Sequence, residues 1–282
     1  MNTALVTGAS SGVGLELTRK VLTEGGHVIA LIRSDLPAGE AALEEAQRAG
    51  RLRIYRTDLE DFAKLRASLA EIRAKEARID VLFNNAGVSL GAPRSSPQGR
   101  DVHFDVNTVA PYVIVRELRP LLEAGRSRTV VNTSSNAMLF VKRFDPDQLE
   151  KGTEFRKLFG PYAASKLALS LWTAALAADL ARDGIEIRSV HPGGIKSTMT
   201  RSSGMPFWLL PIAHLFFAPP SRGASRLHDV AFGRFRGKSG VFVNEDREVP
   251  VPFSDHADAV LAKVRSIYER ELLDGRPAAR AG

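Results

Sequence analysis

The feature that most constrains the fold is a regular alternation of short apolar runs with longer segments of helical periodicity. The run HVIALI at 27–32 is continuously apolar, as expected of a strand that is buried on both faces of a sheet. The segment 61–77 instead places Phe62, Leu65 and Ile72 at helical spacing. Strands that alternate with helices pair in parallel through right-handed crossovers. The sequence therefore predicts an α/β fold, a Rossmann-type doubly wound parallel sheet in a three-layer α/β/α arrangement.

The expected elements follow one another along the whole chain. Strands are expected at 3–6, 27–32, 52–57, 79–85, 128–134, 186–192 and 240–244. Helices are expected at 13–24, 38–49, 61–77, 103–123, 161–182, 221–232 and 255–273. No repeat or linker divides this series, so residues 1–274 are interpreted as a single domain, with 275–282 as a disordered tail. Two stretches interrupt the alternation, an insertion at 136–160 and a loop at 193–220, and such long loops are where these folds place binding sites.

The composition argues against several classes of function. The 282 residues contain no cysteine, which excludes disulfides, thiol catalysis and cysteine-ligated metals. The six histidines have no metal-ligand spacing, so we expect no metal site. We interpret the net charge of +7 as an arginine-rich surface that binds a phosphorylated cofactor, and we expect no nucleic-acid partner. No signal peptide is visible and the apolar stretch 206–217 is too short for a membrane span, so we expect a cytoplasmic protein.

A glycine-rich turn, TGASSGVG at 7–14, joins the first expected strand to the first expected helix. Gly8 permits the sharp turn, Gly12 lets the backbone approach a ligand, and Gly14 permits close helix packing. The start of the helix directs free N–H groups and the positive end of its dipole at the same place, which favours a pyrophosphate. This position in the chain indicates a dinucleotide site.

The stretch GPYAASK puts Tyr162 four residues before Lys166, so both side chains lie on one face of the expected helix. A tyrosine can act as acid and base if its pKa falls from about 10 towards neutrality, and a nearby cation favours the phenolate. At about 4 Å and an effective dielectric near 20, one positive charge contributes roughly 4 kcal/mol, close to 3 pKa units. The spacing alone leaves open whether the two residues are a solvated pair or an acid–base pair.

The glycine spacing Gly-x-x-x-Gly-x-Gly resembles that of the short-chain dehydrogenase/reductase family. Further motifs agree in family order: NNAG at 84–87, Asn107 in DVNTVAP, NTSS at 132–135, YAASK at 162–166 and HPGGIKSTM at 191–199. The resemblance covers about residues 2–245 and implies an NAD(P)-dependent oxidoreductase that interconverts a carbonyl and an alcohol. The long gap between Ser135 and Tyr162 resembles the branch that includes retinol dehydrogenases and related carbonyl reductases.

The resemblance implies a role for each catalytic residue. Tyr162 is the expected acid/base, and Lys166 is expected to lower the pKa of Tyr162 and to hold the nicotinamide ribose. Ser135, preferred to Ser134 because the family's serine is normally the second of this pair, is expected to position the substrate oxygen. Asn107 is expected to anchor a water that connects Lys166 to solvent.

The resemblance also implies the cofactor contacts. Ile32 stands where NAD-preferring members carry an acid, and the following Arg33 can pair with a 2′-phosphate, so we predict NADP(H) over NAD(H). Asp58 is expected near the adenine, although DLED also fits a helix N-cap. Ser197, with Thr198 as a neighbouring candidate, is expected at the carboxamide. The full expected set is Gly8, Ser10, Ser11, Gly12, Val13, Gly14, Arg33, Asp58, Leu59, Asn85, Ala86, Gly87, Tyr162, Lys166, Pro192, Gly193, Ile195 and Ser197.

The apolar loop at 202–224 favours a lipophilic aldehyde, ketone or alcohol as substrate, or peripheral membrane contact through 205–217. Many relatives form a homodimer or homotetramer through the helices expected at 103–123 and 161–182. The alternatives are a catalytically silent NADP(H)-binding sensor or scaffold, an NAD-preferring dehydrogenase, and a nucleotide-sugar epimerase or dehydratase. The intact set of asparagine, serine, tyrosine and lysine argues against the silent sensor.

Overall fold

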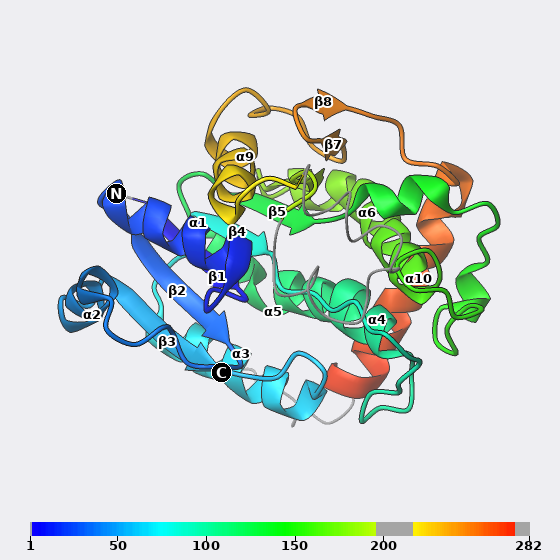
Figure 1. Cartoon of the computed structure of the whole chain (residues 1–282), viewed down its shortest axis with the longest axis horizontal. Helices are drawn as coiled ribbons and strands as arrows, with labels where there is room; N and C mark the ends of the chain where they lie inside the picture. The colour runs from blue at the N-terminus through cyan, green and yellow to red at the C-terminus, as the bar shows by residue number, and fades with distance from the viewer. Residues whose placement is uncertain (1, 196–216, 274–282) are drawn as a thin grey trace.

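The computed structural model describes residues 2–195 and 217–273, and these form an α/β fold around a central sheet (Figure 1). The strand order is β3-β2-β1-β4-β5-β6-β7-β8. All neighbouring strands are parallel except β7 and β8. The strands are β1 Thr3–Thr7, β2 His27–Ile32, β3 Leu52–Arg56, β4 Val81–Asn84, β5 Thr129–Thr133, β6 Glu186–His191, β7 Phe242–Asn244 and β8 Arg247–Glu248. The predicted fold class is confirmed.

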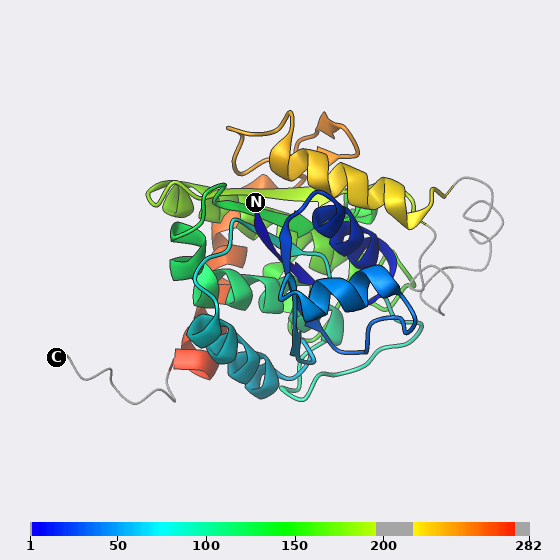
Figure 2. The ribbon, with the colours of Figure 1, turned by 90° about the vertical axis from the view of Figure 1, so that its left-hand side faces the viewer.

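Helices cover both faces of the sheet. The longer ones are α1 Gly12–Thr23, α2 Ala41–Arg48, α3 Phe62–Lys75, α5 Ala110–Glu123, α6 Pro161–Ala181, α9 Pro220–Phe232 and α10 Ala257–Tyr268. The helices α1, α2 and α9 share one apolar cluster with the sheet, and α3, α5, α6 and α10 share another. Figure 2 shows α9 beside α1, on the other side of the molecule from α10.

The strand β1 shows why its sequence is continuously apolar. Ala4 and Val6 belong to the cluster that contains α1 and α9, whereas Leu5 belongs to the cluster on the opposite face. All three side chains are fully buried. Burial of a side chain the size of leucine or valine contributes roughly 1.5–3 kcal/mol, so a polar residue at any of these positions would weaken the sheet.

Two features differ from the sequence-based expectation. The helix expected at 103–123 is broken into a short α4 (Val102–Phe104), a π-helical segment η1 (Asp105–Val109) and α5. A π-turn adds one residue to the helical turn, and a periodicity near 3.6 does not reveal it. The strand β8 was also not predicted, because two exposed residues carry no alternation that a pattern could detect. The insertion 136–160 contains the 3₁₀ segments η2 (Asn136–Phe140) and η3 (Pro146–Gln148).

The end of the described chain packs back onto the centre of the fold. The segment η5 (Ser254–His256), the helix α10 and the π-helical segment η6 (Glu269–Leu273) follow one another without a break. Tyr268 lies edge-on to Tyr112 of α5 with ring centroids 6.0 Å apart, and its hydroxyl donates to Glu117 Oε1 at 2.7 Å. The helix α10 therefore joins α5 and α6 in one core. Within the two described ranges, no helix is both long and apolar enough to cross a membrane.

The strand order predicts a binding crevice along the carboxyl ends of the strands. The chain runs outward from β1 to β2 and β3 on one side, and β4 begins the other side. Open parallel sheets bind ligands at the carboxyl ends of the strands where the order reverses in this way. Here those ends are Thr7 of β1 and Asn84 of β4.

Candidate functional site

The turn between β1 and α1 has the backbone geometry that its glycines predict. Gly8 and Gly12 have φ angles of +69° and +55°, in the left-handed region that favours glycine. A Cβ atom on Gly14 would lie 2.2 Å from the carbonyl oxygen of Gly8, so no other residue fits there. Ser11 occupies the N-cap of α1 without a capping hydrogen bond from its side chain. The first N–H groups of α1, including that of Val13, thus form a cradle for an anion.

The glycine turn is locked to the segment that follows β4. Thr7 Oγ1 accepts hydrogen bonds from the backbone N–H groups of Asn85 and Ala86, both at 2.9 Å. Asn85 Nδ2 in turn donates to the Thr7 carbonyl at 3.1 Å. A Cβ atom on Gly8 would lie 3.2 Å from Ala86, so the two backbones are in van der Waals contact. Thr7 was not singled out from the sequence, although its position at a strand end was visible.

Asn107 lies in the middle of the π-turn and is completely buried. Its Oδ1 accepts from the Val88 N–H at 2.8 Å, and its Nδ2 donates to the Val88 carbonyl at 2.9 Å and to Ser165 Oγ at 3.0 Å. A Cβ atom on Gly87 would lie 2.9 Å from Asn107 Oδ1 and 3.3 Å from Lys166 Nζ. Gly87 therefore lies between Asn107 and Lys166, and the absence of its side chain brings the two together.

The structure separates the two serines after β5. Ser134 Oγ lies 2.8 Å from Ser170 Oγ and 3.2 Å from the Lys166 carbonyl, so it fastens β5 to α6. Ser135 is the N-cap of η2, where its Oγ accepts from the Ala137 N–H at 3.2 Å. Ser135 is also hydrogen-bonded to the Tyr162 side chain. Of the two serines, Ser135 is the one directed at the tyrosine.

The helix α6 begins immediately before the tyrosine. Pro161 occupies the first helical position, where its missing N–H leaves no helical bond unmade and its fixed φ suits the helix. Tyr162 therefore lies in the first turn, where the positive end of the helix dipole favours an anion. The spacing predicted Lys166 one turn further on, and both side chains are buried. Lys166 Nζ donates to the Thr133 carbonyl at the end of β5, at 2.7 Å.

Burial dominates the titration of both groups. It raises the pKa of the Tyr162 phenol, and the hydrogen bond with Ser135 lowers that pKa by less. Burial also lowers the pKa of Lys166, to about 7. The shift at Tyr162 is thus opposite to the one expected from a fully charged Lys166, because burial disfavours the charged form of each group. In the protein alone, Tyr162 therefore keeps its proton near neutral pH, and Lys166 changes its charge in that range.

The far end of the crevice, beyond β2 and β3, is more open. The side chain of Arg33 is 64% exposed, and its Nη1 lies 3.8 Å from Asp58 Oδ2 and 4.0 Å from Glu60 Oε1. The alternative role of Asp58 as a helix N-cap is wrong, since Asp61 caps α3 by accepting from the Lys64 N–H. Asp58 instead accepts from the Glu60 N–H two residues on, in a local turn. Leu59 packs against the core beside it.

The segment after β6 is held from α9. Arg226 Nη1 donates to the Pro192 carbonyl at 2.8 Å, and Gly193 has a φ of +98°. Ile195 forms a parallel bridge with Ala218, so the end of the first described range lies beside the start of the second. The predicted contacts Ser197 and Thr198, and most of the loop at 205–217, lie outside the described residues.

The insertion 136–160 begins directly after Ser135 and ends directly before α6. Leu139 and Phe140 in η2 are exposed by 37% and 64%, the exposed large apolar side chains of the described ranges. Phe159, just before α6, lies edge-on to Phe140 with ring centroids 5.8 Å apart. Apolar surface thus flanks both Ser135 and Tyr162. Among residues 2–195 and 217–273, no three His, Asp or Glu side chains are grouped as a metal site.

Sequence reasoning missed Ser165, which links the two halves of the site. Its Oγ donates to the Tyr162 carbonyl at 2.7 Å and accepts from Asn107 Nδ2, while its carbonyl accepts from Thr108 Oγ1 at 2.8 Å. The available signal was its place directly before Lys166, three residues after Tyr162 and so on the same helical face.

Comparison with known proteins agrees with this geometry. A family model described as short chain dehydrogenase matches residues 2–145 and 150–205. Retinol dehydrogenase 11 of Mus musculus is 33% identical over 224 residues, which cover 78% of this chain and 70% of the relative. The Pseudomonas aeruginosa RhlG/NADP complex is 26% identical with a TM-score of 0.66, over 87% of this chain and 94% of that one. A 4-hydroxyisoleucine dehydrogenase complexed with NADH is 21% identical with a TM-score of 0.68, over 87% and 97%.

Proposed function

This chain belongs to the short chain dehydrogenase family, and from that premise we propose that it is an NADP(H)-dependent enzyme that interconverts a lipophilic carbonyl and its alcohol. The family makes it a nicotinamide-dependent oxidoreductase. The observation that carries the finer proposal is that contacts through Gly87 and Ser165 connect Asn107, Lys166 and Tyr162, and that Ser135 interacts with Tyr162. Asn107 comes from η1, Ser135 from the start of η2, and Tyr162 and Lys166 from α6. All four side chains are buried, which a solvated pair on a helix surface would not be.

When bound, the nicotinamide ring supplies or accepts the hydride, and its oxidised form is cationic. In the direction of reduction, Tyr162 donates its proton to the carbonyl oxygen of the substrate, and Ser135 holds that oxygen as negative charge develops on it. Lys166, with its pKa lowered to about 7, can return a proton to the tyrosine near neutral pH. Asn107, whose amide is held by Val88 and Ser165, would anchor the water that connects Lys166 to solvent.

The direction of the pKa shift at Tyr162 supports reduction as the easier direction for the protein's own residues. A phenol whose pKa is raised by burial keeps its proton and is ready to donate it. The reverse reaction needs the phenolate, which requires the positive charge of the oxidised cofactor beside Lys166. The first turn of α6 adds a favourable dipole for that form.

Arg33 supports NADP(H) as the cofactor. It is exposed at the end of β2, and the residue before it is Ile32 rather than an acid. A 2′-phosphate at this place would meet a guanidinium fork, and Asp58 and Glu60 lie near enough to orient that fork. The relatives bind either NADP or NADH, so the preference is our proposal. A lower KM for NADH than for NADPH would contradict it.

The insertion supports a lipophilic substrate, because its Val141 and Leu158 pack against the apolar cluster that contains Tyr162. Leu139, Phe140 and Phe159 add further apolar side chains to the same insertion. The similarity to retinol dehydrogenases points the same way. Peripheral membrane contact through 205–217, a homodimer or homotetramer, and a cytoplasmic location also remain predictions.

A substrate screen that follows NADPH absorbance tests the proposed function. We expect turnover of aldehydes or ketones, with kcat/KM rising as the chain of the carbonyl compound lengthens. Burial of each additional methylene contributes about 0.8 kcal/mol, so three methylenes give roughly a 50-fold rise. A flat response to chain length would refute the lipophilic substrate. Binding of NADPH without turnover of any carbonyl compound would favour the silent sensor.

A further inference from the structure

The π-turn that carries Asn107 begins at a buried carboxylate. Asp105 is completely buried, and its carbonyl oxygen accepts from the Ala110 N–H, the bond that closes the π-turn. Its side chain accepts from Ser96 Oγ at 2.5 Å and from Arg100 Nε at 2.7 Å. Asp105 therefore closes the π-turn with its backbone and anchors it with its side chain.

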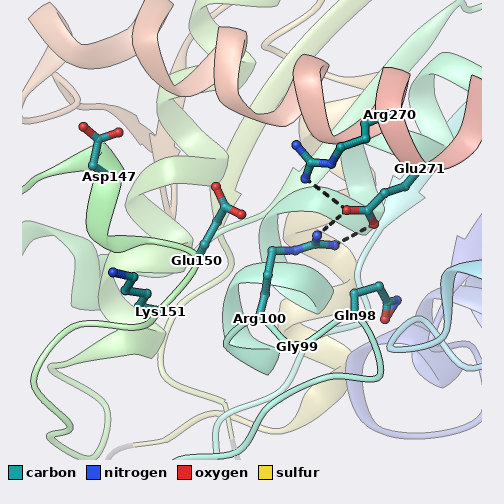
Figure 3. A pocket seen from close by; sticks show the side chains of 8 residues that line it. All are labelled: Gln98, Gly99, Arg100, Asp147, Glu150, Lys151, Arg270 and Glu271. Carbon is teal, nitrogen blue, oxygen red and sulfur yellow. Dashed lines mark hydrogen bonds and ion pairs between the residues drawn. The ribbon is translucent and has the colours of Figure 1, made fainter. Parts of the chain in front are cut away.

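Arg100 joins this turn to the C-terminal end of the described chain. Its two terminal nitrogens face the two carboxylate oxygens of Glu271 in η6, with Nη2 and Oε2 at 3.0 Å and the second contact through Nη1 (Figure 3). Arg270 Nη2 also lies 3.2 Å from Glu271 Oε1. The Arg100 side chain is only 7% exposed, and its guanidinium lies over the Phe62 ring at 5.4 Å. Arg100 is thus held between one carboxylate of the active-site turn and one of the C-terminal segment.

Of the three residues Asp105, Arg100 and Glu271, Glu271 has the most exposed side chain, at 21%. A surface pocket of about 550 Å³ opens beside it, and its lining includes Gln98, Gly99, Asp147, Glu150, Lys151 and Arg270. Burial raises the pKa of Asp105, and Arg100 opposes that shift. Without the ion pair to Glu271, the Arg100 guanidinium would no longer be fixed beside the buried Asp105 carboxylate, whose charge it balances.

We propose that Glu271 is a positioning residue which, through Arg100 and Asp105, fixes the π-turn that presents Asn107 to Lys166. The C-terminal segment is then part of the support of the active site as well as part of the core. The expected effect on turnover rests on the proposed function. The expected effect on the stability of the π-turn rests only on the contacts of Glu271, Arg100 and Asp105.

A second arginine–glutamate pair with two hydrogen bonds provides the control. Arg53 Nε and Nη2 donate to the two oxygens of Glu76 at 2.7 Å each, and the Glu76 side chain is 5% exposed, compared with 21% for Glu271. This pair joins β3 to the end of α3, and the further hydrogen bond of the Glu76 side chain comes from the Tyr55 hydroxyl of β3. Glu271→Gln and Glu76→Gln each remove one negative charge. In both variants the amide nitrogen is a donor, so one of the two hydrogen bonds from the guanidinium is lost.

The test is hydrogen exchange of the full chain, followed by mass spectrometry on peptides that span 102–112. We expect roughly tenfold faster exchange in Glu271→Gln than in the wild type, because a charge-assisted pair no longer holds the turn closed. In Glu76→Gln the same peptides should exchange at the wild-type rate. Unchanged exchange in Glu271→Gln, or an equal rise in both variants, would overturn the inference.

Kinetics of the same variants test the catalytic consequence. Glu271→Gln should lower kcat about tenfold and leave the KM for NADPH within about twofold, because the turn lies on the proton-handling side of the site. Glu76→Gln should leave both constants unchanged. Faster exchange without a fall in kcat would also overturn the positioning role. If the wild type reduced no carbonyl compound, the proposed function would fail, and the exchange comparison would still decide whether Glu271 holds the turn.

Discussion

The two ends of the crevice are built in opposite ways. At the catalytic end, Ser135, Tyr162, Lys166 and Asn107 are each no more than 8% exposed, and hydrogen bonds tie them to neighbouring groups. At the other end, Arg33 is 64% exposed, and its carboxylate neighbours lie at 3.8 and 4.0 Å. Buried groups act in a low effective dielectric and exposed charges are screened, so substitutions at the first end should have the larger effects.

The strongest test of this difference is Tyr162→Phe. It should lower kcat roughly a thousandfold or more, because it removes the proton donor, and change the Kd for NADPH less than about twofold. Tyr55→Phe is the matched control, because Tyr55 is also a buried tyrosine. Its hydroxyl donates a hydrogen bond to the Glu76 carboxylate, away from the catalytic residues. Single-turnover kinetics and NADPH fluorescence titration measure the two quantities. Substantial turnover in Tyr162→Phe would remove Tyr162 from the mechanism.

The two neighbouring serines give the next largest contrast. Ser135→Ala should lower kcat about a hundredfold, as loss of one donor to a developing oxyanion does. Ser134→Ala should leave kcat within a few-fold and lower the free energy of unfolding by about 1 kcal/mol, because Ser134 bonds β5 to α6. Steady-state kinetics and urea denaturation separate the two effects. The opposite pattern would transfer the catalytic role to Ser134.

Buried Lys166 should be visible in the pH dependence of stability. Its pKa in the folded protein, about 7, lies below the ordinary value of 10.5 that it regains on unfolding. Between these values the unfolded chain binds more protons than the folded one, so stability rises with pH. The free energy of unfolding should increase by roughly 2 kcal/mol from pH 7 to pH 9 in the wild type relative to Lys166→Met.

Urea denaturation at pH 7, 8 and 9 measures this slope. Lys75→Met serves as the control, because Lys75 is an exposed residue in a surface pair with Glu71, and it should leave the slope as in the wild type. If Lys166→Met keeps the wild-type slope, Lys166 is charged in the folded protein, and its proposed exchange of a proton with Tyr162 near neutral pH fails.

The smallest predicted effect is at the open end of the crevice. Arg33→Ala should raise the KM for NADPH about tenfold, equivalent to about 1.4 kcal/mol, and leave the KM for NADH nearly unchanged. Arg56→Ala is the matched control, because Arg56 is a similarly exposed arginine at the end of the next strand, paired with Asp35. Equal changes for both cofactors would mean that Arg33 does not contact the 2′-phosphate.

The sequence predicted the fold and the local motifs where a short-range rule applied. The parallel sheet followed from the alternation of elements, and Gly8, Gly12 and Gly14 lie in the turn where their conformational freedom is needed. The rules failed where packing decides. The π-turn at 105–109 has no distinct periodicity, and the N-cap of α3 is Asp61, although Asp58 fitted the same pattern. The pKa of Tyr162 moved opposite to the expected direction because burial was not known from spacing.

By itself, the sequence determined which residues share a helical face and which turns require glycine, because these follow from bond geometry within a few residues. The four-residue spacing of Tyr162 and Lys166 was therefore enough to make them neighbours on one helix. The tertiary structure decided that Gly87 lies between Asn107 and Lys166, and that Ser134 bonds to Ser170 and not to the Tyr162 side chain. It also decided that Glu271 reaches Arg100 from the far end of the described chain. Such contacts join residues many positions apart, and only the packing of the complete sheet and its helices brings them within hydrogen-bonding distance.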